Sequence, residues 1–249
     1  MRTRTFPAAA VALTFFLPLG LPVPALADSD APDSDPFEPL NRGTFRFNDT
    51  FDIWLAEPAA SGWYFVFREP GTRHLGYFFS NLRFPVRFTS TLLQGRVRDS
   101  AEETGRFVVN STVGLGGFFD PASGWGLKQH DEDMGLTFGH WGAGAGAYLT
   151  LPLLGPSGIR DGPGLVLDSA LQSGPAFINP WLGTGLRVAD ALNRRARLLN
   201  DAEEAKESSL DYYVFVRNAY RQYRDAQLGI EGTETEEDPD DLYQIDEDE

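Results

Sequence analysis

Apolar residues recur at helical spacing in the last third of the chain, which predicts two long amphipathic helices. The stripe of the first is made of Leu182, Leu186, Ala189, Leu192, Ala196 and Leu199. The second follows Ser208-Ser209-Leu210-Asp211, a segment whose hydroxyl and carboxylate groups suit the N-cap position. Its apolar side is made of Tyr213, Val216, Tyr220 and Tyr223.

Proline and glycine divide the preceding part of the chain into short segments. Prolines stand at positions 58, 70, 85, 121, 152, 156, 163, 175 and 180. Pro70 suits the first turn of a helix through Leu82, which Pro85 then stops. Since the alternation typical of strands is scarce, we expect an all-α fold of short helices joined by Gly/Pro-rich loops.

One further helix start is indicated by a capping box. In Ser100-Ala101-Glu102-Glu103, the serine hydroxyl would accept from the Glu103 amide while the Glu103 side chain bonds back to Ser100. The helix that it opens should carry Phe107 and end near Gly114.

The two ends of the chain have compositions that differ from the rest. Residues 1–27 combine Arg2 and Arg4, an apolar run and Ala25-Leu26-Ala27, a pattern typical of a cleaved secretory signal peptide. A membrane anchor is the weaker interpretation because prolines interrupt the run. Residues 28–35 form a polar linker, residues 36–229 the folded domain, and residues 230–249 an acidic tail that we expect to be disordered. After residue 27 no segment has the length of about 20 apolar residues that a spanning helix needs.

Charge and cysteine content exclude several classes of function. The formal charge is −15, but residues 231–249 hold eleven acidic residues and no basic ones, which leaves −4 for residues 1–230. An acidic exported chain lacks the basic surface that nucleic-acid binding requires. The 249 residues contain no cysteine, so they offer no disulfide, no thiolate ligand and no site for a thioether-linked lipid.

Few residue patterns suggest catalysis, a metal or a cofactor. His74, His130 and His140 form no zinc-binding spacing, and the sequence has no G-x-S-x-G elbow. We interpret His140 as a structural hydrogen-bonding residue in a tight loop. The glycines of segment 142–146 are misplaced for a dinucleotide loop and favour close packing or a hinge. The acidic residues 131–133 are expected to form a solvated loop. We therefore predict no enzyme activity, no metal and no cofactor.

Arginine and aromatic residues leave two interpretations open. Seven arginines fall within one aromatic-rich third of the chain: Arg68, Arg73, Arg83, Arg87, Arg96, Arg98 and Arg106. Guanidinium groups bind phosphate oxygens in bidentate fashion, which suits phospholipid headgroups, but scattered surface ion pairs are an equal alternative. The tryptophans likewise suit either a membrane interface or an ordinary core.

Five motifs together resemble the MlaA/VacJ family. The first reads DPFEPLNR over residues 35–42 and is followed by Phe47-Asn48, and the second reads NSTVGLGGFFD over residues 110–120. The third and fourth are TFGHWGAG at 137–144 and LPLLGP at 151–156, and the last combines Asp211-Tyr212-Tyr213 with Arg217 and Tyr220. Their order and spacing agree with the family from residue 35 to about residue 223.

The resemblance implies a flat, ring-like, mostly helical protein held in the periplasmic leaflet of the outer membrane. Such proteins are taken to remove misplaced phospholipid from the outer leaflet and to pass it to a soluble periplasmic carrier, and they associate with trimeric porins. The lipid path or a hinge is expected at Asn41, Arg42, Phe47, Asn48, Gly114, Gly116, Gly117, Asp120, Gly139, His140, Gly142, Gly144 and Pro152. We expect valine at Gly144, at the end of the third motif, to crowd the backbone and impair transport.

Two alternatives to a membrane-bound transporter remain. Family members are typically lipoproteins, and the missing cysteine would also fit a soluble periplasmic lipid carrier; a phospholipid hydrolase is the third hypothesis. Charge complementarity with a carrier is expected at Arg217, Arg221 and Arg224, which recur at helical spacing before the acidic tail. The alternative is that these arginines form only a solvated face.

Overall fold

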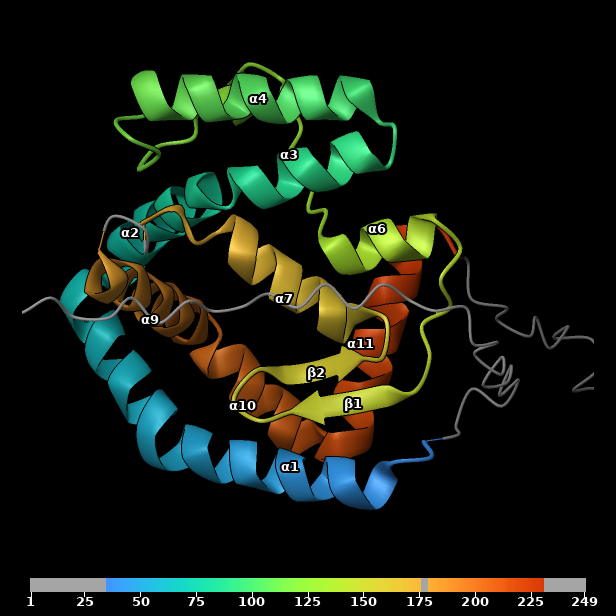
Figure 1. The fold of residues 1–249 in the computed structure, drawn as a ribbon. Helices are drawn as coiled ribbons and strands as arrows, with labels where there is room; N and C mark the ends of the chain where they lie inside the picture. Colours follow the sequence, from blue (N-terminus) through green and yellow to red (C-terminus); the bar gives the residue numbers. More distant parts are fainter. Residues whose placement is uncertain (1–34, 176–178, 231–249) are drawn as a thin grey trace, which may run out of the picture. The chain divides into compact units, whose positions relative to one another are not determined.

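The computed structural model describes residues 35–175 and 179–230, and this part of the chain is mostly helical. The signal peptide, nearly all of the linker and the acidic tail predicted above lie outside these residues. The elements are, in chain order, α1 (Glu38–Phe51), η1 (Asp52–Ala56), α2 (Glu57–Leu82), α3 (Phe84–Leu93), α4 (Val97–Thr112), α5 (Pro121–Gly124), α6 (Met134–His140), β1 (Tyr148–Leu151), β2 (Gly155–Gly158), α7 (Asp161–Leu171), α9 (Pro180–Arg197), α10 (Leu199–Ser208) and α11 (Tyr212–Leu228). Helix α2 packs against α9, α3 against α4, and α6 against α7 (Figure 1).

The two C-terminal helices predicted from the apolar stripes are confirmed, and side-chain caps begin both. Asn179 Oδ1 accepts a hydrogen bond from the Trp181 amide at the start of α9. Asp211 Oδ1 accepts from the Val214 amide at the start of α11. Helix α11 ends at Gly229, whose φ of 68° is the left-handed conformation that favours glycine.

Helix α2 has a break in its middle, close to the predicted helix start at Pro70. Arg68 has φ 49° and ψ −174°, which is not helical, so α2 consists of two helical halves. Pro70 lies in the first turn of the second half, where its missing amide hydrogen has no effect on the helix. Pro85 occupies the corresponding place in α3.

The predicted capping box is wrong. Helix α4 begins at Val97, so Ser100 and Glu103 lie inside it. The Ser100 hydroxyl donates to Thr91 Oγ1 of α3, and Glu103 is fully buried against Arg87. A tertiary partner has therefore replaced the local one for both side chains.

The predicted helical fold is confirmed, and a small two-stranded antiparallel hairpin is its one described sheet. Tyr148 pairs with Gly158 and Leu151 with Gly155, Pro152 lies in the turn, and Pro156 lies in β2 opposite Thr150. Two asparagine side chains from α1 hold the backbone of β1 from outside.

The distribution of polar and apolar side chains is the reverse of that in most water-soluble domains. Among the described residues, the fully or nearly buried side chains are mostly polar or charged, whereas many large apolar side chains are exposed. Four of the buried residues are arginines that bind carboxylates, and they are Arg87, Arg106, Arg160 and Arg224. Within residues 35–175 and 179–230, no helix is both long and apolar enough to cross a bilayer.

Helices α6 and α7 cross with their backbones in contact, and two glycines permit this approach. A Cβ atom on Gly164 would lie 2.5 Å from the Gly135 nitrogen, and one on Gly135 would lie 2.6 Å from both Arg224 Nη2 and Asp161 Oδ1. A side chain at Gly164 would therefore push α6 and α7 apart. One at Gly135 would displace the side chains of Arg224 and Asp161, which form an ion pair.

We expect Gly164→Ala to destabilise the protein, because its methyl group would meet backbone atoms that cannot move independently. Overpacking of this kind costs about 1–3 kcal/mol of unfolding free energy. Gly162→Ala on the same helix is the matched control, since nothing lies within 4 Å of its Cβ position. Chemical unfolding of both variants measures the difference, and equal stability would mean that the helices do not cross this closely.

Candidate functional site

The first motif fixes α1 to the hairpin through two asparagines. Asn41 Nδ2 donates to the Tyr148 carbonyl and Asn41 Oδ1 accepts from the Thr150 amide, both at 2.9 Å. Asn48 repeats the arrangement two turns later, with the Leu151 carbonyl at 2.9 Å and the Leu153 amide at 2.8 Å. An amide side chain carries a donor and an acceptor side by side, so it can extend a strand as another backbone would.

Neighbouring residues of this motif connect α1 to the start of α11. The Tyr213 hydroxyl donates to Asp35, whose carboxylate also accepts from Asn41. Arg42 binds Asp211 at 2.8 Å, and its guanidinium carbon lies 4.5 Å from the centre of the Tyr213 ring. These contacts serve the structure of the domain, whereas Phe47 on the same helix is 54% exposed and is available to a lipid.

The second motif forms a closed turn between α4 and α5. Asp120 accepts from Arg106 at 2.8 Å and from Asn110 at 2.9 Å, and its carboxylate caps α5. Asn110 Oδ1 also accepts from the Ala122 amide. Burial raises the pKa of Asp120, but its hydrogen bonds from Ser123, Asn110 and Arg106 outweigh this effect and hold the pKa below its ordinary value.

The glycines of the second motif make this turn possible. A Cβ on Gly114 would lie 2.4 Å from the Phe119 carbonyl oxygen. Gly116 and Gly117 have φ of 76° and 96°, and a Cβ on Gly117 would meet the Asn81 side chain at 2.7 Å. Leu115 also has a positive φ, of 53°. The motif therefore encodes a rigid loop on the side of α2, and nothing in its geometry suggests chemistry.

The residues of the third and fourth motifs lie between α6 and the turn of the hairpin. Gly139 lies against Leu228, and His140 is exposed at the end of α6. Gly142 has φ 92°, whereas Gly144 has an ordinary φ and nothing within 4 Å of its Cβ position. The expected crowding by valine at Gly144 is therefore wrong, because the chain there has space for a side chain. Pro152 lies exposed in the hairpin turn.

The arginines expected to dock a carrier are not a surface group. Arg217 is 4% exposed and Arg224 is 7% exposed, so the interior of the domain holds both side chains. Arg224 binds Asp133 at 2.6 Å and Asp161 at 2.9 Å. Arg221 is half-buried, with its guanidinium carbon 5.9 Å from the Tyr148 ring centre. Arg217 and Arg224 follow the buried Tyr213 at helical spacing, so they share the inward face of α11 with it.

The Arg224 cluster joins α6, α7 and α11. Burial raises the pKa of Asp161, yet hydrogen bonds from Arg160, Arg224 and Tyr220 outweigh it and lower the pKa to about 2. Asp133 caps α6 through the Leu136 amide, so the predicted solvated loop at 131–133 is wrong for this residue. Glu132 is also paired, with Arg96.

A row of four charged side chains from α7, α9 and the junction of α2 with α3 was not recognised in the sequence. Arg83 lies within electrostatic range of Asp168, Asp190 and Arg194, and Arg194 forms an ion pair with Asp190. Burial lowers the pKa of Arg194 although its side chain is 54% exposed, so this arginine is surrounded by protein while still reaching solvent. An acid within the apolar run Leu165-Val166-Leu167-Asp168 is the one sequence signal that could have indicated the row.

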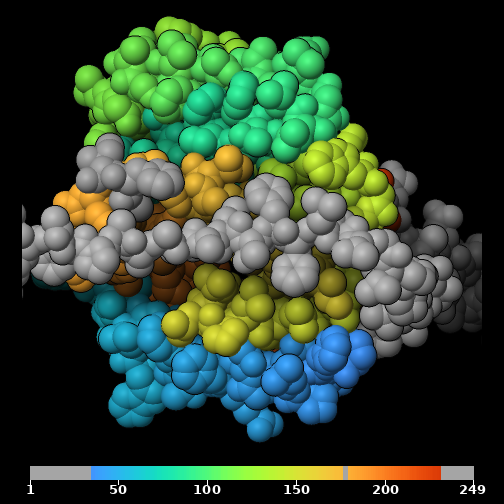
Figure 2. All heavy atoms as spheres, viewed as in Figure 1, coloured from blue at the N-terminus to red at the C-terminus, as the bar shows by residue number. Residues whose placement is uncertain are grey.

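Apolar side chains cover much of the outer surface, and four of the five tryptophans are among them. Trp54, Trp125, Trp141 and Trp181 are between 57% and 85% exposed. Trp63 is half-buried and donates its Nε1 hydrogen to Asn193 Oδ1 of α9, so it belongs to the packing between helices. Figure 2 shows that α1 and the α3–α4 pair present their side chains at opposite edges of the face in view. Exposed aromatic residues in this number are typical of surfaces that contact lipid or a partner.

The structure predicts an unusual pH dependence of stability at Asp168. Burial and the charge of Asp133 raise its pKa to about 6 from 3.8, so the folded state holds a proton more tightly than the unfolded chain. Wild-type unfolding free energy should therefore fall, by up to about 3 kcal/mol, as the pH rises from 4 to 7.

Asp168→Asn should remove this contribution while keeping the acceptor for the Met134 amide. The stability of the variant relative to wild type should rise over the same pH range, as measured by denaturant titration. Parallel curves for the two proteins would contradict the raised pKa.

Comparison with known proteins identifies the family. A family model described as MlaA lipoprotein matches residues 33–227. The intermembrane phospholipid transport system lipoprotein MlaA of Haemophilus influenzae is 34% identical over 197 residues, or 76% of this chain and 77% of that protein. The Shigella flexneri protein of the same name is 33% identical over 196 residues, or 77% of each chain.

The fold agrees with a solved structure. A chain from the study "Structural basis for maintenance of bacterial outer membrane lipid asymmetry" matches with a TM-score of 0.68 and 31% sequence identity, over 78% of this chain and 99% of that one. The motifs that suggested the resemblance are, in this structure, the clamps and tight turns that hold the fold together. The chain therefore belongs to the MlaA family.

Proposed function

We propose that the protein is a non-enzymatic component of intermembrane phospholipid transport, seated in the periplasmic leaflet of the outer membrane. In this role it removes phospholipid from the outer leaflet and passes it to a soluble periplasmic carrier, which maintains lipid asymmetry. The observation that carries the proposal is the run of exposed apolar side chains at the end of the first half of α2, over residues 64–67.

That half of the helix exposes four consecutive large side chains. Tyr64, Phe65, Val66 and Phe67 are 40%, 72%, 69% and 38% exposed. Because successive residues of an α-helix are about 100° apart, four in a row point in all directions around it. A helical turn that exposes large apolar side chains in several directions is stabilised by an apolar environment, which a bilayer provides and water does not.

The length of this segment supports insertion into one leaflet. Residues 57–67 rise about 16 Å as a helix, close to half of a hydrocarbon core that is about 30 Å thick. The exposed Trp54 in η1 and Trp181 in α9 add aromatic rings of the kind that lie at the interface. Insertion into one leaflet in this way needs no helix that spans the bilayer.

The charged row offers a polar path for a headgroup. A phospholipid headgroup enters an apolar medium only at high cost, so a row of paired charges beside apolar walls lowers the barrier. Arg83 and Arg194 supply guanidinium groups for the phosphate, and Asp190 supplies a partner for a cationic headgroup. Leu165 and Val166 on the neighbouring α7 are exposed apolar residues that can follow the acyl chains.

The partners follow from family membership. A porin trimer would bind part of the exposed apolar surface, and a soluble carrier would receive the lipid on the periplasmic side. Arg221 is the one member of the predicted docking group that is not fully buried, so charge complementarity with the carrier rests on other residues as well. Co-purification from outer membranes in mild detergent, scored for a porin trimer, tests the first partner.

We expect the double variant Phe65→Asp/Val66→Asp to lose membrane association. Each aspartate in a hydrocarbon environment costs about 3 kcal/mol, which exceeds what the remaining contacts of this half-helix supply. Leu210→Asp is the matched control, because Leu210 is fully exposed but lies among Ser208, Ser209 and Asp211. Flotation with lipid vesicles measures the effect. If the double variant floats with the vesicles as well as wild type does, this half of α2 does not insert into the leaflet.

Arg194→Gln should slow transport while leaving the protein in the membrane. Loss of one charged hydrogen bond to phosphate corresponds to about a tenfold change in rate. Arg73→Gln is a close control, because Arg73 is also 54% exposed and also pairs with an acid one turn earlier. A membrane-impermeant amine reagent would measure phospholipid at the cell surface, which should increase for Arg194→Gln alone. Equal labelling of both variants would show that the charged row is not part of the lipid path.

Two other functions give distinct results. A soluble periplasmic lipid carrier, which the missing cysteine allows, would be recovered in the soluble periplasm after gentle lysis. A phospholipid hydrolase would release lyso-lipid or free fatty acid from labelled phospholipid. Recovery of the protein in outer membranes without either product supports the transport function.

A further inference from the structure

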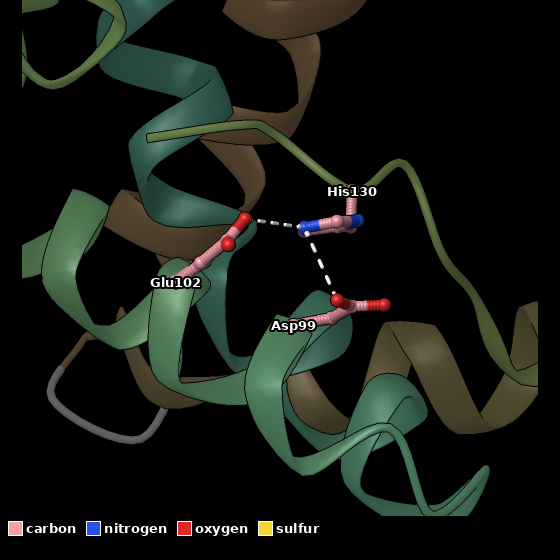
Figure 3. Close-up of side chains that lie close together, drawn as sticks. All are labelled: Asp99, Glu102 and His130. Atoms are coloured by element: carbon pink, nitrogen blue, oxygen red, sulfur yellow. Dashed lines mark hydrogen bonds and ion pairs between the residues drawn. The ribbon is translucent and has the colours of Figure 1, made fainter. Parts of the chain in front are cut away.

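Three metal-ligating side chains converge beside α4, away from the charged row. Asp99 and Glu102 are one turn apart on the same face of the helix, and His130 reaches them from the loop between α5 and α6 (Figure 3). The His130 Nε2 atom lies 3.1 Å from Glu102 Oε2 and 3.8 Å from Asp99 Oδ1. All three residues are partly buried.

Hydrogen bonding alone does not account for this arrangement. The Nε2 atom of a neutral imidazole carries at most one proton, so it can donate to one acceptor. Glu102 is within hydrogen-bonding distance, whereas Asp99 Oδ1 at 3.8 Å is not. A cation at the point of convergence would bind the imidazole nitrogen and both carboxylate oxygens at the same time.

The remaining atoms of the three residues are already held in place. Asp99 Oδ2 accepts from Arg96 Nε at 2.6 Å, and Glu102 Oε1 accepts from Arg98 Nε at 3.2 Å. The backbone amide of His130 donates to Glu103 Oε1 at 2.6 Å. In each carboxylate the arginine therefore binds one oxygen and leaves the other directed at the imidazole. Outer contacts of this kind orient the ligands of metal sites.

The two arginines oppose a cation electrostatically, and the local charges limit this effect. Arg98 is 90% exposed, so water screens its charge strongly. Arg96 is also paired with Glu132, whose carboxylate lies in the same loop as His130. Glu132, Asp99 and Glu102 therefore outnumber the two guanidinium groups around the convergence point.

We propose that Asp99, Glu102 and His130 bind a divalent transition-metal ion, with Zn²⁺ as the best-suited representative. Ligands at about 2.1 Å from a tetrahedral zinc lie about 3.4 Å apart, and the two distances from His130 Nε2 bracket this value. An imidazole among the ligands favours zinc over calcium or magnesium, which prefer oxygen alone. Three protein ligands leave the fourth position to water or to a partner's side chain.

Such an ion would fix the 125–133 loop to α4. The loop leads directly into Asp133, which caps α6 and binds Arg224. Binding at one end of the loop would therefore stabilise the start of α6 and, through Arg224, its contact with α11. An ion that binds only the folded protein raises its stability in proportion to the logarithm of the metal concentration.

The test is a calorimetric titration of the full-length chain, purified without a histidine tag and stripped with chelator, with zinc chloride. We expect about one Zn²⁺ per chain and a rise in melting temperature on its addition. The variants His130→Gln, Asp99→Asn and Glu102→Gln should each weaken binding by at least about tenfold. Their melting temperatures without zinc, compared with wild type, establish that each is folded.

His140→Gln is the matched control, because His140 is an exposed histidine at the end of α6, outside the cluster. It should bind zinc as wild type does. Substitution of Co²⁺ should give an absorption spectrum of a nitrogen- and oxygen-bound ion that His130→Gln abolishes. No binding by the wild-type protein would reduce the cluster to hydrogen bonds and ion pairs and overturn the proposal. Equal affinity in wild type and all three variants would place the ion elsewhere and overturn it as well.

Discussion

The pairing of buried arginines with carboxylates is the interaction on which this domain depends. Arg87 binds Glu103, Arg106 binds Asp120, and Arg224 binds Asp133 and Asp161, all with the guanidinium group nearly inaccessible. Removing one partner from such a pair leaves an uncompensated charge in the interior, at a cost of about 3–5 kcal/mol. The first two pairs join consecutive helices, whereas Arg224 joins α11 to residues 63 and 91 positions away, so together the pairs hold both near and distant elements in contact.

The polar interior of the domain accompanies an apolar outer surface. A protein that presents apolar side chains to lipid gains little by burying others, because lipid and core are equally apolar. Specific polar contacts then become the main source of affinity between helices. The same contacts determine which way each helix faces, and this is why Arg217 and Arg224 lie inside although their spacing on α11 is that of a solvated face in a water-soluble protein.

Local features of the fold could be predicted from the sequence, and long-range ones could not. Helix α9 was recognised from its apolar stripe, and α11 from its stripe and the N-cap segment 208–211, and these signals act within a few residues. The partner of Arg224 is 91 residues away at Asp133, and nothing in the sequence near either residue indicates the pairing. The capping box failed for the same reason, since Glu103 found its partner on another helix.

The candidate site shows the same division. The motif residues were expected to form a lipid path or a hinge, and in the structure several of them form tight turns and clamps, with glycines at positive φ and Asn41 bonded to a strand. The charged row is made of single residues from separate helices and was not recognised. Only Asp168, an acid among leucines and valine, leaves a signal in the sequence. The lipid path proposed above needs no catalytic geometry. It would require walls that keep their position while headgroups pass. The paired arginines and the asparagine-bound hairpin are rigid elements of that kind, in a protein whose outer surface exposes many large apolar side chains.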